Sequence, residues 1–443
     1  MKKYEFKEHK QGIYKYGDDQ FEVVSLGNHK TKLNTKEIVC YLCADGATSI
    51  SEIKANICKY YRFITTPLNE IKNIVDSLIE RNLLVVHDVK KELHKHVSFN
   101  KSLLKQIDIK VKRRTILSIA DMELSITDLC PFNCSYCSKK ENKSTKDYVT
   151  IEEWKKVIKE AYLMGANGIK LTGGEPLHPL VIDKTLSIAK YAREIGYERV
   201  VLLTSGYSLA DNIQRVVEAG ITEISISYNM INKIEEDKIR NKYVEENFDK
   251  FLVLQEYNIK LNICCVVNQE SIKLVDKVLQ YAIEKGIGCI HYYPVMPVGN
   301  ARDSWDTNKL NVEELKNTMQ RLQKKSVELQ DRISISAEQM FMSFYDDIEL
   351  GCEALNYWVY IAEDGRVSAC ACADMSNYNI KNTSFIKIWR ESDYFENLRS
   401  YVDSTSCKKC NDRKYCTCNC YIRLLQAQNG LHYSYDRCKY NEY

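Results

Sequence analysis

Three cysteines lie within eight residues, at Cys130, Cys134 and Cys137, and they mark the first place in this chain where chemistry could occur. Thiolates at this spacing can bind three corners of a four-iron cluster. Three protein ligands leave one iron open, and an open coordination position is what a catalytic metal site requires. A zinc knuckle, or chance clustering in a cysteine-rich chain, is the alternative interpretation of the same residues.

A second group of seven cysteines lies near the C-terminus. Its spacing is C-x12-G-x4-C, then C-x2-C-x5-C-x3-C, then one more cysteine. The chain has 18 cysteines in all, and in a reducing compartment such a number favours metal binding over a disulfide framework. This part of the chain has few long periodic segments, so metal clusters would have to stabilise it. The seven are Cys352, Cys370, Cys407, Cys410, Cys416, Cys420 and Cys438.

Residues 120–293 alternate between short apolar strands and amphipathic helices, and these elements must position the first cysteine group. Repeated strand–helix units predict a parallel sheet covered by helices. Six units are fewer than the eight of a closed barrel, so we expect a partial barrel with its chemistry at the C-terminal ends of the strands. The expected strands are 122–127, 169–172, 199–204, 223–228, 261–267 and 289–293, and the expected helices are 151–164, 181–195, 208–219, 244–257 and 272–285.

The composition narrows the class of protein. The chain has 443 residues, of which 44% are hydrophobic and 28% charged, as is typical of a globular protein of about three domains. A formal net charge of +3 gives no support for a nucleic-acid partner. The sequence contains neither a run of eighteen apolar residues nor a signal peptide, so we expect a cytoplasmic protein without membrane contact.

The first cysteine group follows the first expected strand, and it resembles the C-x-x-x-C-x-aromatic-C motif of the radical S-adenosylmethionine (SAM) superfamily, with Tyr136 as the aromatic residue. The resemblance spans about residues 120–305. It implies that Cys130, Cys134 and Cys137 bind a 4Fe–4S cluster whose open iron binds the amino and carboxylate groups of SAM. It also implies that SAM yields a 5′-deoxyadenosyl radical, which removes a hydrogen atom from the substrate. The protein would then position and shield a reaction that the cofactor performs.

Further motifs resemble the SAM-contacting positions of that family. The sequence GGEP at 173–176 follows the second strand, where its glycines would let backbone carbonyls approach the SAM ammonium group and Glu175 would add an acceptor. Arg240 would pair with the SAM carboxylate, although a solvated surface charge is the alternative. Residues 297–301 resemble a loop beside adenine. By this resemblance the cofactor-binding residues are Tyr136, Gly173, Gly174, Glu175, Thr204, Ser205, Ser227 and Arg240.

Two of these positions depart from the usual pattern of the family. Ser205 stands where the family usually has asparagine in T-N-G, and Ser227 opens S-Y-N where S-L-D is usual. Six further cysteines lie in expected helices or strands, and we interpret them as packing residues. They are Cys40, Cys43, Cys58, Cys264, Cys265 and Cys289.

The seven-cysteine spacing resembles the SPASM extension of radical SAM enzymes, which implies two auxiliary 4Fe–4S clusters and three clusters in all. The inner auxiliary cluster would lack a fourth ligand. Either its open iron binds a substrate thiolate, or Cys372 or Cys418 completes it. By the resemblance, the outer cluster is bound by Cys407, Cys410, Cys416 and Cys438, and the inner one by Cys352, Cys370 and Cys420.

Residues 1–90 read as a hairpin at 12–16 and 21–25, a third short strand and three helices. This order resembles PqqD-like peptide-recognition domains, which bind the leader of a precursor peptide as an added strand at an exposed sheet edge. The residues from Ser49 also have the form of a capping box with Glu52. A generic winged-helix or dimerisation unit is the alternative.

The sequence therefore predicts an α/β protein, namely a partial (β/α)6 TIM-like barrel with an N-terminal winged-helix-like domain and a C-terminal Cys-rich iron–sulfur (SPASM) domain. The expected parts are a PqqD-like leader-recognition domain at 1–90, a linker at 91–118, the radical SAM barrel at 119–310, bridging helices at 311–350 and the SPASM domain with two auxiliary 4Fe–4S clusters at 351–443.

Together the resemblances imply a radical SAM maturase that installs a crosslink in a ribosomally made peptide, with a Cys thioether to carbon as first choice. A carbon–carbon crosslink, or formylglycine formation as in sulfatase-maturing enzymes, are alternatives within the family. The partners would be a precursor peptide and an electron donor such as flavodoxin or ferredoxin. A zinc-stabilised binding protein and a radical SAM enzyme for a small molecule remain alternatives. Spacing alone assigns no catalytic acid or base.

Overall fold

The computed structural model describes residues 2–7, 11–25, 30–61, 66–88, 101–139, 148–233, 235–337 and 354–404. Of the seven C-terminal cysteines and the two spare thiols, Cys370 and Cys372 lie within these ranges. The roles predicted for the others concern residues outside them and stay predictions. Those others are Cys352, Cys407, Cys410, Cys416, Cys418, Cys420 and Cys438.

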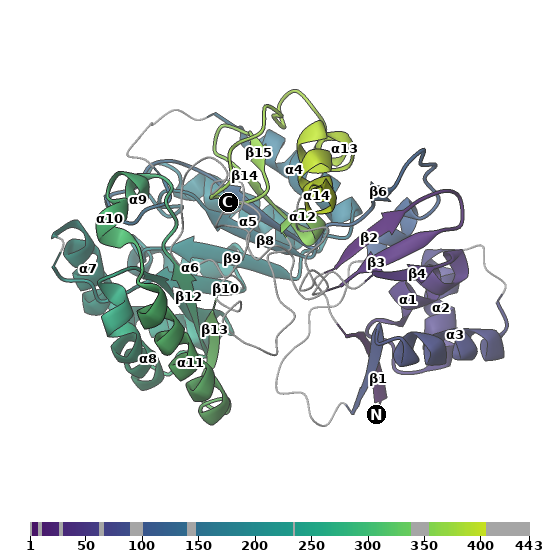
Figure 1. The fold of residues 1–443 in the computed structure, drawn as a ribbon, viewed down its shortest axis with the longest axis horizontal. Coiled ribbons are helices and arrows are strands. Elements are labelled where there is room, and N and C mark those ends of the chain that lie inside the picture. The colour runs from purple at the N-terminus through teal and green to yellow at the C-terminus, as the bar shows by residue number, and fades with distance from the viewer. Residues whose placement is uncertain are drawn as a thin grey trace.

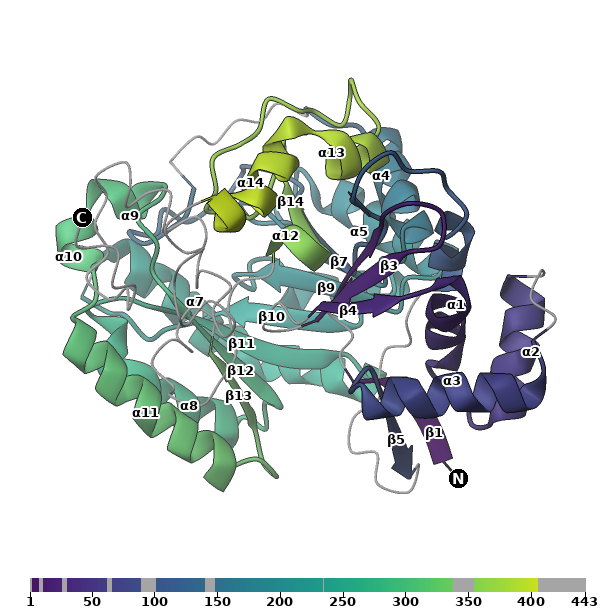
Figure 2. The same ribbon diagram turned by 45° about the vertical axis from the view of Figure 1, so that its right-hand side comes forward.

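The largest sheet in the described ranges has nine strands in the spatial order β13-β12-β11-β10-β9-β8-β7-β14-β15. All neighbours are parallel except β14 and β15. The sheet lies in the centre of the molecule, with helices along its outer side (Figures 1 and 2). The strands are β7 (Asp121–Ser125), β8 (Gly168–Thr172), β9 (Arg199–Thr204), β10 (Glu223–Ser227), β11 (Lys260–Val267), β12 (Cys289–Pro294), β13 (Ser334–Ala337), β14 (Trp358–Ile361) and β15 (Val367–Ser368).

The six strands expected from the sequence correspond to β7 to β12, and β13 and β14 extend the sheet by one parallel strand on each side. The intervening helices also occur where the apolar spacing predicts them, with three differences in bounds. Helices α6 and α8 begin at Ile213 and Val275, later than the expected 208 and 272, because a 3₁₀ turn precedes each of them. Helix α7 begins about nine residues before the expected start at 244, because its first turns carry mostly charged residues and show little apolar period. The helices are α4 (Ile151–Leu163), α5 (Ile182–Ile195), α6 (Ile213–Glu218), α7 (Glu235–Phe251) and α8 (Val275–Glu284).

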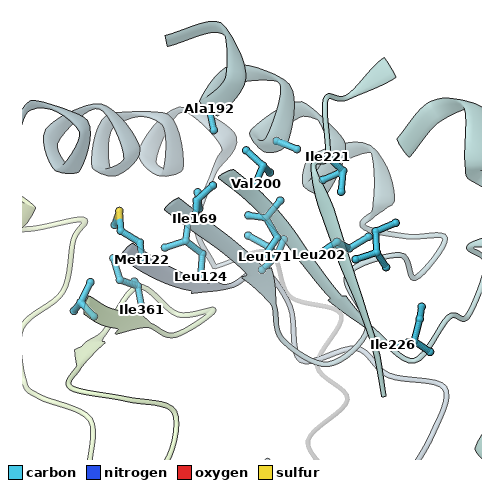
Figure 3. Packing of buried hydrophobic residues seen from close by; sticks show 14 of the residues in the cluster. Met122, Leu124, Ile169, Leu171, Ala192, Val200, Leu202, Ile221, Ile226 and Ile361 are labelled. Carbon is cyan, nitrogen blue, oxygen red and sulfur yellow. The ribbon is translucent and has the colours of Figure 1, made fainter. Parts of the chain in front are cut away.

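The two faces of the sheet differ in chemistry. Successive side chains of a strand point to opposite faces, and the outer face carries apolar residues such as Met122, Ile169 and Leu202, which are fully buried against the helices (Figure 3). The inner face carries many polar residues beside apolar ones such as Val201, and several of the polar residues keep part of their surface accessible. They include Glu123, Lys170, Glu223, Ser227, Cys264, Cys289 and His291.

An ionic network ties together the N-terminal ends of three strands. Arg199 at the start of β9 binds Asp121 at the start of β7 (3.4 Å) and Glu223 at the start of β10 (3.1 Å). Asn262 also donates to Glu223 (2.7 Å). These contacts join the strands at their N-terminal ends. In parallel barrels the chemistry lies at the opposite, C-terminal ends of the strands.

The N-terminal unit has the expected hairpin, third strand and three helices in that order. Its four-stranded sheet has the order β4-β3-β2-β6, and a separate pair joins β1 to β5. The elements are β1 (Lys2–Phe6), β2 (Gly12–Lys15), β3 (Phe21–Val24), β4 (Lys30–Leu33), α1 (Thr35–Ala44), α2 (Ile50–Tyr60), α3 (Leu68–Glu80), β5 (Leu84–Asp88) and β6 (Thr115–Ile116).

The capping box expected at α2 is only half formed. The Ser49 hydroxyl accepts from the main-chain N–H of Glu52 (3.1 Å), but the Glu52 carboxylate accepts from the N–H of Thr48 (2.7 Å). A complete capping box occurs instead at α1, between Asn34 and Glu37. Both helix starts are therefore fixed by side-chain contacts.

Part of the predicted linker belongs to the N-terminal unit. Residues 101–106 form a 3₁₀ helix, and Leu103, Leu104 and Ile107 are buried in the core of that unit. Strand β6 pairs with β2. The sequence did not predict this role, because the apolar residues are interspersed with many lysines and show only weak periodicity.

The C-terminal part of the described chain packs against the segment that joins the N-terminal unit to β7. Trp389 on α13 is buried, and its indole N–H donates to the Ser118 carbonyl (3.0 Å). Of the bridging helices expected at 311–350, α11 forms, whereas residues 334–337 form β13, whose length and alternation suit a strand. The part of this prediction from 338 onward lies outside the described residues. The remaining helices are α9 (Asn300–Asp303), α10 (Trp305–Asn308), α11 (Val312–Glu328), α12 (Ala354–Tyr357), α13 (Phe385–Glu391) and α14 (Asp393–Ser404). Across the described ranges, the search for a helix long and apolar enough to cross a membrane finds none.

Candidate active site

The three cysteines of the first group lie on the loop that follows β7, at the C-terminal end of the sheet. Each of Cys130, Cys134 and Cys137 is half-buried. Burial raises the pKa of the Cys130 thiol to about 12, and the nearby Cys134 and Cys137 contribute to that rise. Burial likewise raises the pKa of Cys134 to about 11. A metal ion deprotonates such thiols when it binds, so this donor set fits an iron–sulfur cluster.

The loop after β12 packs directly on the cysteine loop. The main-chain N–H of Asn300 donates to the Cys137 carbonyl (3.0 Å), and its side-chain amide donates to Asn133 (2.9 Å). Gly299 has φ +59°, and a Cβ there would lie 2.3 Å from the main chain of Ser138. The segment that the sequence places beside adenine therefore lies against the cysteines, and glycine is required for that approach.

The two glycines after β8 serve a close approach of main chains. A Cβ on Gly173 would lie 2.4 Å from the Thr127 carbonyl oxygen, and a Cβ on Gly174 would lie 2.3 Å from that of Leu129. The N–H groups of Gly174 and Glu175 donate to these same two carbonyls (2.6 Å each). Only glycines allow this contact, which docks the loop after β8 on the segment leading to Cys130. A contact of these glycines with SAM stays a prediction.

Glu175 is buried and bound by four donors. Its Oε1 accepts from the Thr204 hydroxyl (2.6 Å) and the Leu177 N–H (3.0 Å). Its Oε2 accepts from the N–H (2.8 Å) and the hydroxyl (2.5 Å) of Ser205. Burial raises the pKa of Glu175, although these hydrogen bonds oppose the rise. Three residues predicted to bind SAM thus bind one another and join the loops after β8 and β9.

Arg240 is buried, which argues against the alternative of a solvated surface charge. Its Nη2 donates to Asn229 (3.1 Å) and Asn241 (3.0 Å), and its guanidinium lies 5.4 Å from the centre of the Tyr136 ring. Its Nε has no hydrogen-bond partner among the described residues, nor has Nδ2 of Asn229. A buried cation with a free donor fits the carboxylate expected of SAM.

Ser227, the predicted ribose contact, lies at the end of β10 on the inner face. In the sheet register Ser227 pairs with Cys264, and Cys264 pairs with His291. The thiol of Cys289 lies 3.4 Å from His291 Nε2. Because side chains alternate along β11 and β12, Cys264, Cys289 and His291 point to the inside of the barrel. The prediction that Cys264 and Cys289 are packing residues of the core is therefore wrong.

The other four cysteines interpreted as packing residues differ in how far they are buried. Cys40, Cys43 and Cys265 are buried, as predicted. Cys58 is exposed, because it lies on the outward side of α2, whose buried face carries Ile53 and Ile57.

An aromatic cluster lies near the cysteine loop, and no sequence motif predicted it. The rings of Phe132, Tyr207 and Tyr243 lie 5.9 to 6.4 Å apart, and His178 lies 6.3 Å from Tyr207. These residues come from four separate segments, and all are partly accessible. Their shared position emerges only from the fold, because no short-range spacing links them.

An ionic cluster between the cysteine loop and β14 was also missed. Lys139 Nζ binds Asp128 (2.5 Å) and Glu363 (2.5 Å) and donates to the Ser125 hydroxyl (2.9 Å). Burial raises the pKa of Asp128 to about 6. Burial acts the same way on Glu363, but the Lys139 charge outweighs it and holds the pKa of Glu363 at about 2. The contacts between 125–139 and 363 span over two hundred residues, which no local pattern can predict.

Cys370 of the seven-cysteine group and the spare Cys372 lie close together. The neighbouring Cys372 thiol raises the pKa of Cys370, and burial acts in the same direction. The N–H of Ala373 donates to the Cys370 carbonyl (3.1 Å), so a tight turn carries both side chains. Two neighbouring thiols suit a soft metal centre.

Two families match the chain. The radical SAM superfamily matches residues 124–282, and the iron–sulfur cluster-binding SPASM domain matches residues 352–412. The first match implies SAM and a 4Fe–4S cluster, and the second implies additional iron–sulfur clusters. Both cofactors are those expected from the two cysteine groups.

Among curated proteins, the AdoMet-dependent heme synthase of Methanosarcina barkeri is 25% identical over 323 residues, which cover 68% of this chain and 91% of that protein. The GTP 3′,8-cyclase of Staphylococcus aureus is 31% identical over 206 residues, which cover 43% of this chain and 58% of the cyclase. The likeness to the cyclase is therefore confined to part of both proteins.

Among solved structures, SuiB of Streptococcus suis bound to its precursor peptide SuiA has a TM-score of 0.64 at 13% identity, covering 96% of this chain and 97% of SuiB. The structure of anSMEcpe with bound AdoMet has a TM-score of 0.52 at 16% identity, covering 72% of this chain and 91% of that one. At these identities the likeness concerns the fold.

Proposed function

This chain is a radical SAM enzyme with a SPASM domain, and we propose that it modifies a precursor peptide made on the ribosome. The observation that carries the proposal is the likeness to SuiB, which covers 96% of this chain and so takes in the N-terminal unit. SuiB was solved with a precursor peptide bound. The anSMEcpe fold, also solved with a peptide, supports a peptide substrate for the remaining part.

The N-terminal unit would bind the leader of that peptide, as PqqD-like domains do. Within the described residues β4 pairs only with β3, so its other edge can accept a strand. Arg81 at the end of α3 donates to the Lys32 carbonyl (3.2 Å), which shows that this carbonyl points away from β3. The N–H of Lys32 points the same way, because both groups of a strand residue share a side.

The C-terminal end of the barrel would hold SAM over the cysteine loop. When bound, the cluster and SAM supply a radical that removes a hydrogen atom from the peptide. Cys130, Cys134 and Cys137 would bind the cluster, and Arg240 would receive the SAM carboxylate. Glu175 would act mainly by fixing the loops around the cofactor, since all its acceptor positions are occupied by the chain itself.

The core peptide would lie along the inner face of the sheet. The row Ser227, Cys264 and His291 crosses β10 to β12, and neighbouring strands lie about 4.8 Å apart, so His291 stands roughly 10 Å from the predicted ribose contact. A peptide side chain fits into that distance. These residues are the wall against which the reacting carbon would be held.

Our first choice of product is a Cys thioether to carbon. Its formation would remove two hydrogens, one as an atom and the other as a proton with an electron. SAM and its cluster would supply the radical chemistry for the first, and auxiliary clusters would supply an electron acceptor for the second. The residues that would hold these auxiliary clusters are those of the seven-cysteine group, as the resemblance to the SPASM extension implies. A carbon–carbon crosslink has the same balance, and formylglycine formation would differ by loss of sulfur from a cysteine.

The test uses the anaerobic, fully loaded enzyme with SAM, a flavodoxin or dithionite as electron donor, and as substrate any short peptide found to be encoded beside the gene. We expect one 5′-deoxyadenosine for each pair of hydrogens lost from the peptide, together with loss of one alkylatable thiol. Loss of hydrogens with every thiol still alkylatable would indicate a carbon–carbon bond. SAM cleavage that leaves the peptide unchanged would contradict the proposal.

A small-molecule substrate is the second candidate, because the match to the heme synthase covers 91% of that enzyme and 68% of this chain. Such a substrate would leave the N-terminal unit without a role in binding. The two candidates are separated by whether a peptide carrying its leader raises the rate of 5′-deoxyadenosine formation. A cytoplasmic location with a reduced flavodoxin or ferredoxin suits either candidate.

A further inference from the structure

The ionic cluster beside the cysteine loop joins the two matched domains. Lys139 belongs to the cysteine loop, and Glu363 follows β14 within the segment that matches the SPASM domain. Their side chains meet at 2.5 Å, and the Ser125 hydroxyl donates to the same carboxylate (2.8 Å). The side chains of Lys139, Asp128 and Glu363 are 21%, 16% and 17% exposed. Ion pairs this sheltered from water are well determined in geometry.

Lys139 also touches a predicted cluster ligand through its main chain. Its N–H donates to the sulfur of Cys137 (3.4 Å). A continuous set of contacts therefore runs from the Glu363 carboxylate to the Lys139 ammonium, and from the Lys139 main chain to a ligand sulfur. The Lys139 main chain is also held by Asn300, whose N–H donates to the Lys139 carbonyl (3.2 Å), so the anchor of the Lys139 side chain is one of two contacts that fix this N–H.

Hydrogen bonds to ligand sulfurs raise the reduction potential of an iron–sulfur cluster, because they stabilise the electron-richer reduced form. Groups that orient a metal ligand from behind matter nearly as much as the ligand itself. Substitutions of Lys139 other than proline leave this main-chain donor in place, but a substitution of its anchor can move it. Glu363 is the part of that anchor contributed from outside the cysteine loop.

We propose that Glu363 is a positioning residue for the radical-generating cluster, which holds Lys139 so that its N–H stays on the Cys137 sulfur and thereby raises the reduction potential of that cluster. The SPASM domain would then adjust the electron acceptance of the radical site through this contact, apart from its own clusters. The proposal rests on the radical SAM assignment and holds whatever the substrate is.

Geometry and charge must be separated in the test, because removing a negative charge near a cluster would by itself raise the potential. Glu363→Asp keeps the charge but shortens the side chain by one methylene, so it weakens only the anchoring of Lys139. Glu363→Gln keeps the length but removes the charge. Asp364→Glu is the matched control, since it is a charge-conserving change on the next residue, whose carboxylate binds Arg366 (2.7 Å).

The measurement is a redox titration of the loaded full-length enzyme with SAM and without peptide, following the electron paramagnetic resonance signal that responds to SAM. For Glu363→Asp we expect the ratio of reduced to oxidised cluster at a fixed potential to fall about tenfold, which is the smallest effect that losing a group behind a metal ligand usually has on metal affinity or activity. Asp364→Glu should leave this ratio as in the wild type.

An unchanged ratio in Glu363→Asp, with wild-type iron content, would overturn the proposal, and a rise in Glu363→Gln alone would assign the effect to charge. If Glu363→Asp does not retain its iron, Lys139→Arg repeats the test from the other partner. It also conserves charge but moves the donor atoms, and an unchanged ratio there would overturn the proposal equally. Because no peptide is present, failure of the peptide-maturation proposal would not affect this result.

Discussion

Glu175 is the residue at which the hydrogen-bond geometry constrains substitution most sharply. Two of its four donors are main-chain N–H groups, of Leu177 on one oxygen and of Ser205 on the other. In Glu175→Gln the amide –NH₂ must face one of them, whichever way it turns. We expect this substitution to lower the free energy of unfolding by about 1–3 kcal/mol, the cost of an unpaired buried donor, as measured by chemical denaturation.

The control for Glu175→Gln is Ser205→Ala, which removes a hydroxyl donor but keeps both main-chain donors. Its effect should be smaller, because no two donors are forced together. A loss of stability in Glu175→Gln no greater than that in Ser205→Ala would contradict the assignment of four hydrogen bonds to this carboxylate.

Cys372 bears on the missing ligand of the inner auxiliary cluster. Its thiol neighbours that of Cys370, a predicted ligand of this cluster, so it is placed to complete the coordination. We expect Cys372→Ser to alter the resonance spectrum of one auxiliary cluster or lower its iron content, whereas Cys418→Ser should do neither. A wild-type spectrum in Cys372→Ser would favour an open iron, able to take a substrate thiolate, or Cys418 as ligand.

At the scale of single residues, the sequence predicts those site residues that belong to short local motifs. The cysteine loop and GGEP were predicted because each is a short motif at the end of a recognisable strand, and Arg240, which lies in α7, was predicted from its resemblance to a family position. Their roles stay predictions. The pairing of Lys139 with Glu363 and the row from Ser227 to His291 were not found, since they depend on strands far apart in sequence lying side by side. The buried state of Arg240 likewise follows from its tertiary partners.

At the scale of elements, strongly apolar and regularly spaced segments were predicted well. Strands β7 to β12 formed within one or two residues of their expected bounds. Strands β13 and β14 were missed because each has four residues and no repeating strand–helix unit around it. Cys264 and Cys289 were misjudged because alternation gives two faces, and residue type alone does not tell which face is inside.

The free edge of β4 carries the leader-binding proposal, and a proline tests it. Lys32→Pro removes an N–H that points outward and leaves the pairing of β4 with β3 intact, since proline is tolerated on edge strands. We expect it to weaken binding of the labelled leader about fivefold, as for the loss of one hydrogen bond of about 1 kcal/mol. Fluorescence anisotropy measures this directly.

Lys32→Ala serves as the control, because it removes the same side chain but retains the N–H. It should bind the leader nearly as the wild type does. If Lys32→Pro and Lys32→Ala bind equally well, with unchanged melting temperatures, the leader does not add as a strand at β4.

At the scale of the whole molecule the N-terminal unit is built into the rest of the chain. Tyr14 donates to Asn356 (2.6 Å), the Ile13 N–H donates to the Ser118 hydroxyl (2.8 Å), and β2 pairs with β6. Deleting residues 1–90 would expose Leu103 and Leu104, which belong to its core. Point substitutions on the edge of β4 are therefore a cleaner probe of its role than truncation.

The metal content of the anaerobically purified chain tests the central claim most directly, because both matched domains depend on iron–sulfur clusters. We predict about twelve iron and up to about twelve sulfide per chain, the content of three 4Fe–4S clusters, with a brown colour and SAM cleavage on reduction. About four iron would retain the radical site but remove the auxiliary clusters from the account. Zinc in place of iron, persisting after reconstitution with iron and sulfide, would contradict it.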